Sequence, residues 1–144
     1  MSDERGVEVR LQSWDAAHAE LIRLRTEVFV AEQGVPPELE IDGEDPQCLH
    51  VVARDVGGAV IGTGRMRADG RIGRMAVERA WRGRGVGSRM LVALLAEAER
   101  RELRPWLSAQ AAAVPFYERH GFVPEGERYE EAGIPHQRMR LSFG

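Results

Sequence analysis

The middle of the chain joins a short apolar strand, a loop of glycines and arginines, and an amphipathic helix without a break. The loop reads Arg82-Gly83-Arg84-Gly85-Val86-Gly87. Because glycine has no side chain, the backbone N–H groups of such a loop can approach one ligand closely. The helix that follows adds unpaired N–H groups and the positive end of its dipole. The pattern predicts a site for a phosphate or pyrophosphate, with Arg82 and Arg84 supplying charge at its rim.

Two common phosphate-binding motifs do not fit this loop. A Walker A loop requires G-x-x-x-x-G-K-[ST], and the loop has no lysine at the required place. The dinucleotide fingerprint G-x-G-x-x-G, begun at Gly83, needs a third glycine where the chain has Ser88. That fingerprint also follows the first strand of its unit, whereas this loop lies past the midpoint of the chain.

The remaining pattern, R-G-x-G-x-G after an apolar strand, resembles the acyl-CoA pyrophosphate loop of the GCN5-related N-acetyltransferases (GNAT). The resemblance implies acetyl-CoA as the cosubstrate and a GNAT (acyl-CoA N-acyltransferase) fold. The residues that it places at the pyrophosphate are Arg82, Gly83, Arg84, Gly85, Val86, Gly87 and Ser88.

The resemblance continues into the second half of the chain. Leu107-Ser-Ala-Gln110 and then Pro115-Phe-Tyr-Glu-Arg-His-Gly-Phe122 look like the other half of the family's cofactor site, which includes Gln110. Tyr117 falls where the family commonly has its general acid. A phenol with a pKa of about 10 can give a proton or a hydrogen bond to a departing thiolate. A half-buried aromatic with a purely structural hydroxyl is the alternative interpretation.

The strand before the loop has a role of its own in the family. Met75, Ala76 and Val77 fall where the family's strand parts from its neighbour at a bulge, which frees backbone groups for the pantetheine arm and the thioester oxygen. Fixed backbone donors that meet a developing negative charge form an oxyanion hole. The side chains of these residues are expected to be ordinary core.

Hydrophobic periodicity and turn residues divide the rest of the chain. Alternation predicts strands over 7–11, 49–54, 60–67, 72–77, 105–109 and 137–143, with another beginning at 121–123. Helices are expected over 15–31 with Asp15 as the N-cap, 88–101 and 112–120, and a long loop over 32–47. The order β-α-β-β-β-α-β-α-β-β predicts an α/β fold in one domain over 1–144, a mixed and mainly antiparallel central sheet flanked by helices.

Composition excludes several other classes. A net charge of −3 and a pI near 5.8 argue against non-specific binding to nucleic acid or to an anionic membrane. No apolar run approaches a membrane span, and the N-terminus carries acids where a signal peptide has basic residues. The single Cys48 allows no internal disulfide and indicates a reducing compartment. We therefore expect a cytoplasmic protein, with no metal site; a homodimer is a further expectation, because dimers are frequent in this fold.

The loop over 32–47 is rich in acids, and a histidine follows it. Carboxylates attract a cationic amine, and a carboxylate or imidazole can remove its proton. The segment from Arg25 to Gln33, with Glu40, Asp42, Asp45 and His50, resembles the ElaA/YjcF-like branch of GNAT proteins, as does the tail around His136. Glu40, Asp42, His50 and His136 are therefore the candidates for binding or deprotonating the acceptor. A merely solvated acidic surface is the alternative.

The sequence is compatible with three functions. The first is an N-acetyltransferase that moves the acetyl group of acetyl-CoA directly to a primary amine of a small molecule. The second is an acyl-homoserine-lactone synthase, because Arg25, Phe29, Glu40, Asp42 and Asp45 also resemble that class, although those enzymes are longer and usually lack so clean a loop. The third is a non-catalytic acyl-CoA-binding or sensing module. Cys48 is a poor candidate for a covalent acyl carrier, because no neighbour in sequence other than His50 could lower the pKa of its thiol.

Overall fold

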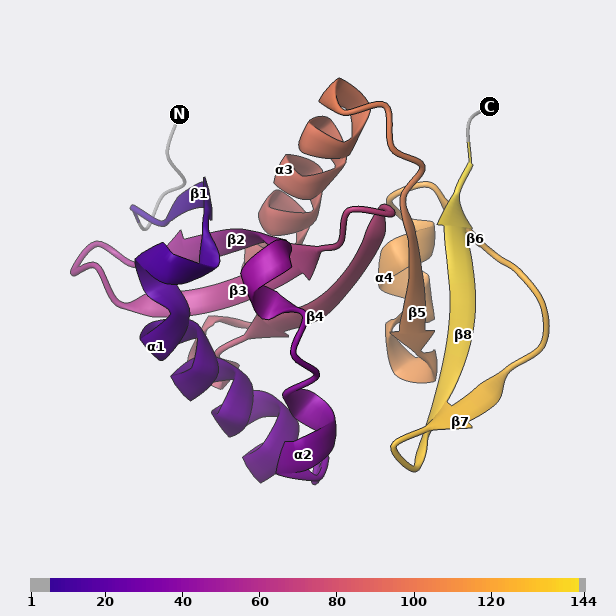
Figure 1. Ribbon diagram of the computed structural model, residues 1–144, viewed down its shortest axis with the longest axis horizontal. Coiled ribbons are helices and arrows are strands. Elements are labelled where there is room, and N and C mark those ends of the chain that lie inside the picture. The colour runs from indigo at the N-terminus through magenta and orange to yellow at the C-terminus, as the bar shows by residue number, and fades with distance from the viewer. Residues whose placement is uncertain (1–5, 143–144) are drawn as a thin grey trace.

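The computed structural model describes residues 6–142, which form one twisted sheet with helices on both faces (Figure 1). The strands lie in the order β1-β2-β3-β4-β5-β8-β6, and β7 pairs with β8 outside this path. Among the strands of residues 6–142, only the β4–β5 pair is parallel, so the sheet is mixed and mainly antiparallel. The strands are β1 Glu8–Gln12, β2 Leu49–Arg54, β3 Val60–Met66, β4 Arg71–Val77, β5 Trp106–Gln110, β6 Phe122–Pro124, β7 Tyr129–Glu131 and β8 Ile134–Leu141.

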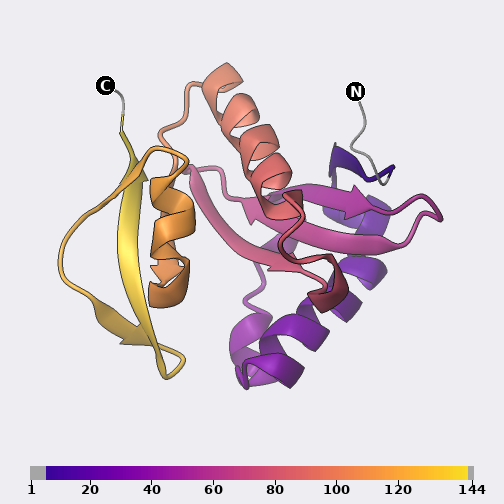
Figure 2. The ribbon, with the colours of Figure 1, turned by 180° about the vertical axis from the view of Figure 1, so that it is seen from behind.

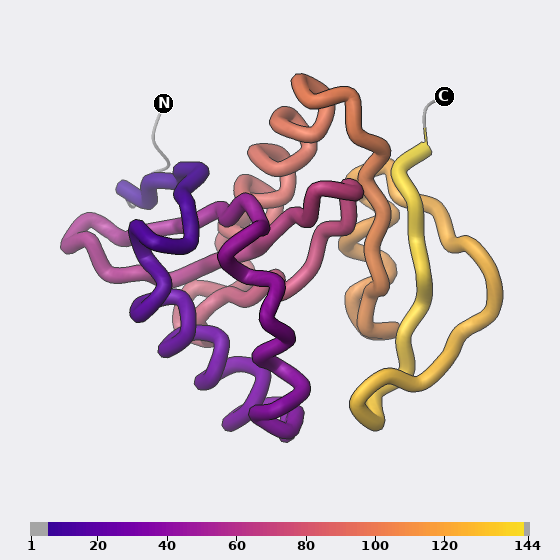
Figure 3. Tube along the Cα trace, viewed as in Figure 1, coloured from indigo at the N-terminus to yellow at the C-terminus, as the bar shows by residue number. Residues whose placement is uncertain are grey.

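The helices divide between the two faces of the sheet. Helices α1 and α2 lie in front of the sheet in Figure 1, and the reverse view of Figure 2 shows α3 and α4 on the other face. The trace of the segment between α1 and β2 stays on the α1 side (Figure 3). The helical elements are α1 Trp14–Arg25, the π-helical η1 Thr26–Glu32, α2 Pro37–Glu40, η2 Asp45–Gln47, η3 Arg79–Trp81, α3 Val86–Arg100, η4 Ala111–Ala113 and α4 Val114–Glu118.

Each face of the sheet has its own buried cluster. Met90, Leu91 and Leu94 of α3 are fully buried against strand residues such as Ile61 and Leu107. On the other face, α1 and η1 bury Leu21, Leu24 and Val28 against Val52 and Val60. Fully burying one such side chain contributes about 1.5–3 kcal/mol, so these stripes fix which side of each helix meets the sheet.

Strand β4 is irregular on both of its edges. Toward β3, Thr63 pairs with Ala76 and Arg65 pairs with Gly73, so β4 has one residue more than β3 between these pairs. Arg74 lies in this bulge with a φ of 51°, a left-handed value that few residues other than glycine adopt. Toward β5, pairing is limited to Arg71 with Trp106 and Ile72 with Leu107. The two strands then diverge (Figure 1).

Several boundaries differ from the sequence prediction. Helix α1 begins at Trp14 with Ser13 as its N-cap, and it passes into a π-helical turn at Thr26. The predicted loop over 32–47 contains α2 and η2, and α3 begins two residues early, at Val86. The sequence also missed β7 and the start of β8. Pro135 lies in this hairpin, where the missing N–H of proline is tolerated because β7 is a short edge strand.

The last predicted strand was expected to reach Phe143, which lies outside the described residues. Across residues 6–142, no helix is both long and apolar enough to cross a membrane.

Candidate active site

A cavity of about 570 Å³ lies where β4 and β5 part. Its walls come from these two strands, from the segment between η1 and η2, from Tyr117 of α4, and from the β7–β8 hairpin. Six of the predicted site residues line it, namely Glu40, Asp42, Met75, Gln110, Tyr117 and His136. The cavity therefore brings together residues that are far apart in the sequence.

The glycine-arginine loop follows the far end of β4, and the structure gives it the open backbone that the sequence predicted. Gly83 and Gly85 have φ values of 76° and 81°, and a Cβ built on either would meet no atom within 4 Å. Gly85 is the N-cap of α3, and the first helical bond runs from the Arg89 N–H to the Gly85 carbonyl at 3.0 Å. The N–H groups of Val86, Gly87 and Ser88 precede that bond and have no helical partner. This surface fits an anionic group.

The charge at the rim of the loop differs from the expectation. The Arg82 guanidinium donates to both carboxylate oxygens of Glu32 at 3.0 and 2.9 Å, and to the Val77 carbonyl at 2.8 Å. Its charge is thus compensated by η1. Arg84 instead lies over the Trp81 ring, 5.1 Å from its centre. Arg84 therefore has no carboxylate partner among residues 6–142, while Arg82 ties the loop to Glu32 of η1.

Two polar contacts hold the neighbouring elements in place. The Ser88 hydroxyl lies 3.0 Å from Nε2 of His120, which joins the start of α3 to the end of α4. The Gln110 side chain donates to the Gln33 side chain at 2.7 Å across the mouth of the cavity. Both glutamines line the cavity, so this contact joins β5 to η1 at its wall.

Tyr117 lies at the wall of the cavity and is 9% exposed. Its ring packs edge-on against Phe116 and Phe122 at 5.0 and 5.8 Å. Burial raises the pKa of Tyr117 to about 12, so the phenol stays protonated at neutral pH. Within residues 6–142 its hydroxyl has no hydrogen-bond partner, and it can therefore donate to a ligand in the cavity.

The backbone of β4 beyond the bulge has the geometry that the resemblance implied. From Gly73 onward, β5 offers no cross-strand partner to Met75, Ala76 and Val77. The Val77 carbonyl is taken by Arg82, and Glu78 bonds back to Ile61 of β3. Of the three side chains, only that of Met75 lines the cavity, while Ala76 is buried on the α1 face.

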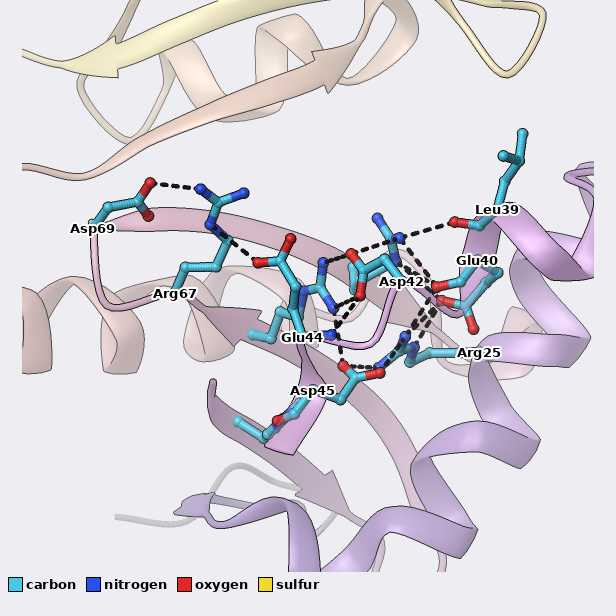
Figure 4. Close-up of polar contacts among 11 residues, drawn as sticks. Arg25, Leu39, Glu40, Asp42, Glu44, Asp45, Arg67 and Asp69 are labelled. Atoms are coloured by element: carbon cyan, nitrogen blue, oxygen red, sulfur yellow. Dashed lines mark hydrogen bonds and ion pairs between the residues drawn. The ribbon is translucent and has the colours of Figure 1, made fainter. Parts of the chain in front are cut away.

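Most of the acidic loop is engaged in an ion-pair network with three arginines (Figure 4). Arg25 is 1% exposed and binds Glu40 at 2.6 Å and Asp45 at 2.8 Å. The other two arginines lie on β3 and β4. The network is completed by Arg65 with Asp42 and Asp45, and by Arg74 with Glu40 and Asp42.

The network balances three cations with three carboxylates, and it lowers the pKa values of two of these carboxylates. Hydrogen bonds from Arg65 hold the pKa of Asp42 far below its ordinary value. Burial alone would raise the pKa of Asp45, but the hydrogen bonds and charges of Arg25 and Arg65 lower it on balance. A carboxylate with a lowered pKa is a weak base. Glu40 and Asp42 line the cavity as predicted, but with their charges already paired.

His50 is in a different place from the other candidates. It is fully buried, lies 5.1 Å from the Trp14 ring, and is not part of the cavity wall. Its Nε2–H donates to the Asp45 carbonyl at 2.9 Å, and its Nδ1 has no hydrogen-bond partner in the described part of the chain. Burial lowers the pKa of this imidazole and keeps it neutral. His50 therefore lies outside the cavity and holds the acidic loop through its hydrogen bond to the Asp45 carbonyl.

His136 does reach the cavity. Its Nδ1 lies 2.7 Å from the Ile134 carbonyl, and because a carbonyl can only accept, Nδ1 carries the proton. In the uncharged form of the ring, the lone pair is therefore on Nε2. The ring also stacks on Tyr129 of β7, whose hydroxyl bonds to the Ser108 hydroxyl. These contacts fix the orientation of His136.

Sequence reasoning missed the cations of this site. The partners of Arg65 and Arg74 lie 20 to 34 residues away, so no local pattern identifies them. It also missed Trp106, whose ring is approached by the guanidinium groups of Arg67, Arg71 and Arg138 at 6.0, 5.1 and 4.2 Å.

Comparison with known proteins identifies the family. A family model described as an acetyltransferase (GNAT) domain matches residues 11–143. The chain is 40% identical over 121 residues to the uncharacterized N-acetyltransferase YjcF of Bacillus subtilis, an alignment that covers 81% of this chain and 86% of YjcF.

Solved structures agree with this result. An acyl-CoA N-acyltransferase from Pseudomonas aeruginosa superposes with a TM-score of 0.84 at 34% identity, over 95% of this chain and all of the other. Escherichia coli ElaA gives a TM-score of 0.84 at 29% identity, over 94% of this chain and 99% of ElaA. The GNAT fold expected from the loop is thereby confirmed, and with it the general use of an acyl-CoA. The chain belongs to the GNAT acetyltransferase family, in its ElaA/YjcF-like branch.

Proposed function

We propose that this protein transfers the acetyl group of acetyl-CoA to a primary amine of a small molecule by direct attack on the thioester. The main support is that Tyr117 and His136 line the same cavity, which opens where β4 leaves β5. The open glycine loop at the end of β4 supports the choice of an acyl-CoA, because its amides and the α3 terminus fit a pyrophosphate.

The proposed step needs one proton acceptor and one donor. The amine nitrogen forms a bond to the thioester carbonyl carbon, the carbon–sulfur bond breaks, and the sulfur leaves as thiolate. Nε2 of His136 has the free lone pair that can take the amine proton. Tyr117 faces the departing sulfur in this proposal. Because its pKa of about 12 lies above the value of about 8.5 for an ordinary thiol, the phenol stabilises the thiolate chiefly as a hydrogen-bond donor.

The other acceptor-site candidates have supporting roles in this proposal. Glu40 and Asp42, held by their ion pairs with Arg74, form part of the cavity wall at the acceptor, and His50 holds the loop that carries them through the Asp45 carbonyl. Cys48 takes no acyl group, because it is buried and burial raises the pKa of its thiol. A cytoplasmic location is part of the proposal and rests on this single free thiol.

His136→Gln is expected to lower kcat by about tenfold or more. Glutamine cannot accept the amine proton, and general bases typically contribute at least this much. Steady-state rates of CoA release at saturating acetyl-CoA and amine measure kcat. His18→Gln is the matched control, since His18 is exposed and outside the cavity. A kcat of His136→Gln equal to that of the wild type would remove His136 as the base.

Gly85→Val is expected to weaken acetyl-CoA binding by at least about tenfold, which is ~1.4 kcal/mol. The branched side chain would cover the amides at the start of α3, and it would strain a residue whose φ is 81°. Titration calorimetry measures the affinity. Gly126→Val is the control for strain alone, because Gly126 has a φ of 77°, open space around it and no place in the loop. Equal affinities for a folded Gly85→Val protein and the wild type would rule out this loop as the binding surface.

A further inference from the structure

The charges along the cavity are unevenly compensated. The carboxylates of Glu40 and Asp42 are neutralised by the arginines of the network, and Arg67 is paired with Asp69 at 2.7 Å and with Glu44 at 3.4 Å. Two charged side chains of the wall have no ion pair among residues 6–142, namely Arg71 and Glu131. An unpaired cation and an unpaired anion therefore face the same cavity.

Arg71 and Glu131 lie at opposite ends of the cavity. Arg71 is the first residue of β4 and is level with Trp106 of β5. Glu131 ends β7 opposite Ile134, near His136, which is level with Gln110 at the other end of β5. Gln110 is four positions along the strand from Trp106, and a strand rises ~3.3 Å per residue, so the two levels are about 13 Å apart. His136, the proposed base, lies at the same end as Glu131.

Arg71 is not placed to serve the cosubstrate. It begins β4, whereas the glycine loop follows Val77 at the other end of that strand. Six residues of strand put the two about 20 Å apart. The guanidinium of Arg71 lies instead beside Trp106, 5.1 Å from the ring centre, within a group of three arginines. Of these, Arg67 and Arg138 have carboxylate partners, at 2.7 and 3.3 Å.

We propose that Arg71 is a specificity residue that binds a carboxylate of the acceptor, so that the acceptor is an amino acid whose amine and carboxylate are separated by a chain of several carbons. This inference rests on the proposed acetyl transfer and names its substrate class. The ammonium end lies toward Glu131 and His136, and the carboxylate end lies at Arg71, which can bind it with two parallel N–H donors. A simple cationic amine or a diamine places no anion on Arg71.

The test compares matched acceptors. A series of ω-amino acids, from glycine to ε-aminocaproate and longer, is assayed beside alkylamines such as n-pentylamine, which has the same chain as ε-aminocaproate without the carboxylate. We expect kcat/KM to rise with chain length and to exceed that of the matched alkylamine by about tenfold or more, the scale of one charge-assisted ion pair. Arg71→Gln should abolish this preference by raising the KM of the ω-amino acids toward that of the matched alkylamines. Arg140→Gln is the control, an arginine on β8 that is outside the cavity wall.

A binding measurement makes the result independent of turnover. Calorimetry with the product, N-acetyl-ε-aminocaproate, should give binding to the wild type and to Arg140→Gln, and binding at least about tenfold weaker to Arg71→Gln. The same affinity for Arg71→Gln and the wild type, or no binding to either, would overturn the anion subsite. Equal acetylation of alkylamines and ω-amino acids would also overturn it and leave the acetyl transfer standing. Product binding that depends on Arg71, without turnover of any amine, would instead support the subsite and count against the proposed reaction.

Discussion

Tyr117→Phe is expected to lower kcat by about ten- to a thousandfold while the affinity for acetyl-CoA changes by less than about twofold. The hydroxyl is the only group removed, and within residues 6–142 it has no partner whose loss would disturb the fold. Its contribution should arise when negative charge develops on the departing sulfur. Single-turnover rates with saturating acetyl-CoA, together with calorimetry, separate the two quantities.

The second tyrosine of the chain provides the control. Tyr129→Phe loses the bond to Ser108 but keeps the ring that stacks on His136, so its kcat should stay near that of the wild type. The pH profile adds a check. Because the pKa of Tyr117 is about 12, the wild type should show no loss of rate from phenol ionisation below about pH 11. A Tyr117→Phe protein with kcat within about twofold of wild type would make Tyr117 a structural residue.

Arg25→Met is expected to lower the free energy of unfolding by about 3–5 kcal/mol, the usual cost of removing one partner from a buried ion pair. The side chain is 1% exposed, and its removal leaves Glu40 and Asp45 buried with fewer donors. Since whole domains are stable by only about 5–15 kcal/mol, this is a large fraction of the total. Urea unfolding, followed by tryptophan fluorescence, measures it.

The control for Arg25 lies on the same helix. Arg23→Met removes an exposed arginine whose contact is one long hydrogen bond of 3.5 Å to the Val60 carbonyl, so it should change stability by less than about 0.5 kcal/mol. A second check uses acid. The pKa values of Asp42 and Asp45 are lowered in the folded state, so their stabilisation is complete above about pH 4 and is lost as the pH falls further. If Arg25→Met unfolds within about 1 kcal/mol of wild type, the network is not a stabilising element.

The parts of the fold that were predicted correctly depend on local patterns. The stripe of Met90, Leu91 and Leu94 repeats at helical spacing, and the strands on either side alternate or are continuously apolar. Gly83 and Gly85 are needed for their left-handed backbone, which the sequence reveals by residue type alone. Such features are set by neighbours in the chain, so the sequence contains them in full.

The parts that could not be predicted depend on distant partners. The acids at 40, 42 and 45 look like a solvated surface in the sequence, and only folding brings Arg25, Arg65 and Arg74 to them. His50 was assigned to the acceptor site because it is close to the acids in sequence. Its side chain instead lies on the side of β2 that faces Trp14. The hairpin that carries His136 was missed in part because Pro135 interrupts the strand pattern.

In the proposed reaction, acetyl-CoA gives its acetyl group directly to an amine bound in the cavity between β4 and β5. The most direct measurement follows an isotopically labelled acetyl group from acetyl-CoA in the presence of the matched amines, with mass spectrometry of both protein and small molecules. Direct transfer should give labelled N-acetylated amine and an equal amount of free CoA, no label on the protein, and a much lower yield for Tyr117→Phe. Bound acetyl-CoA that is never consumed, or label retained on the protein, would contradict it.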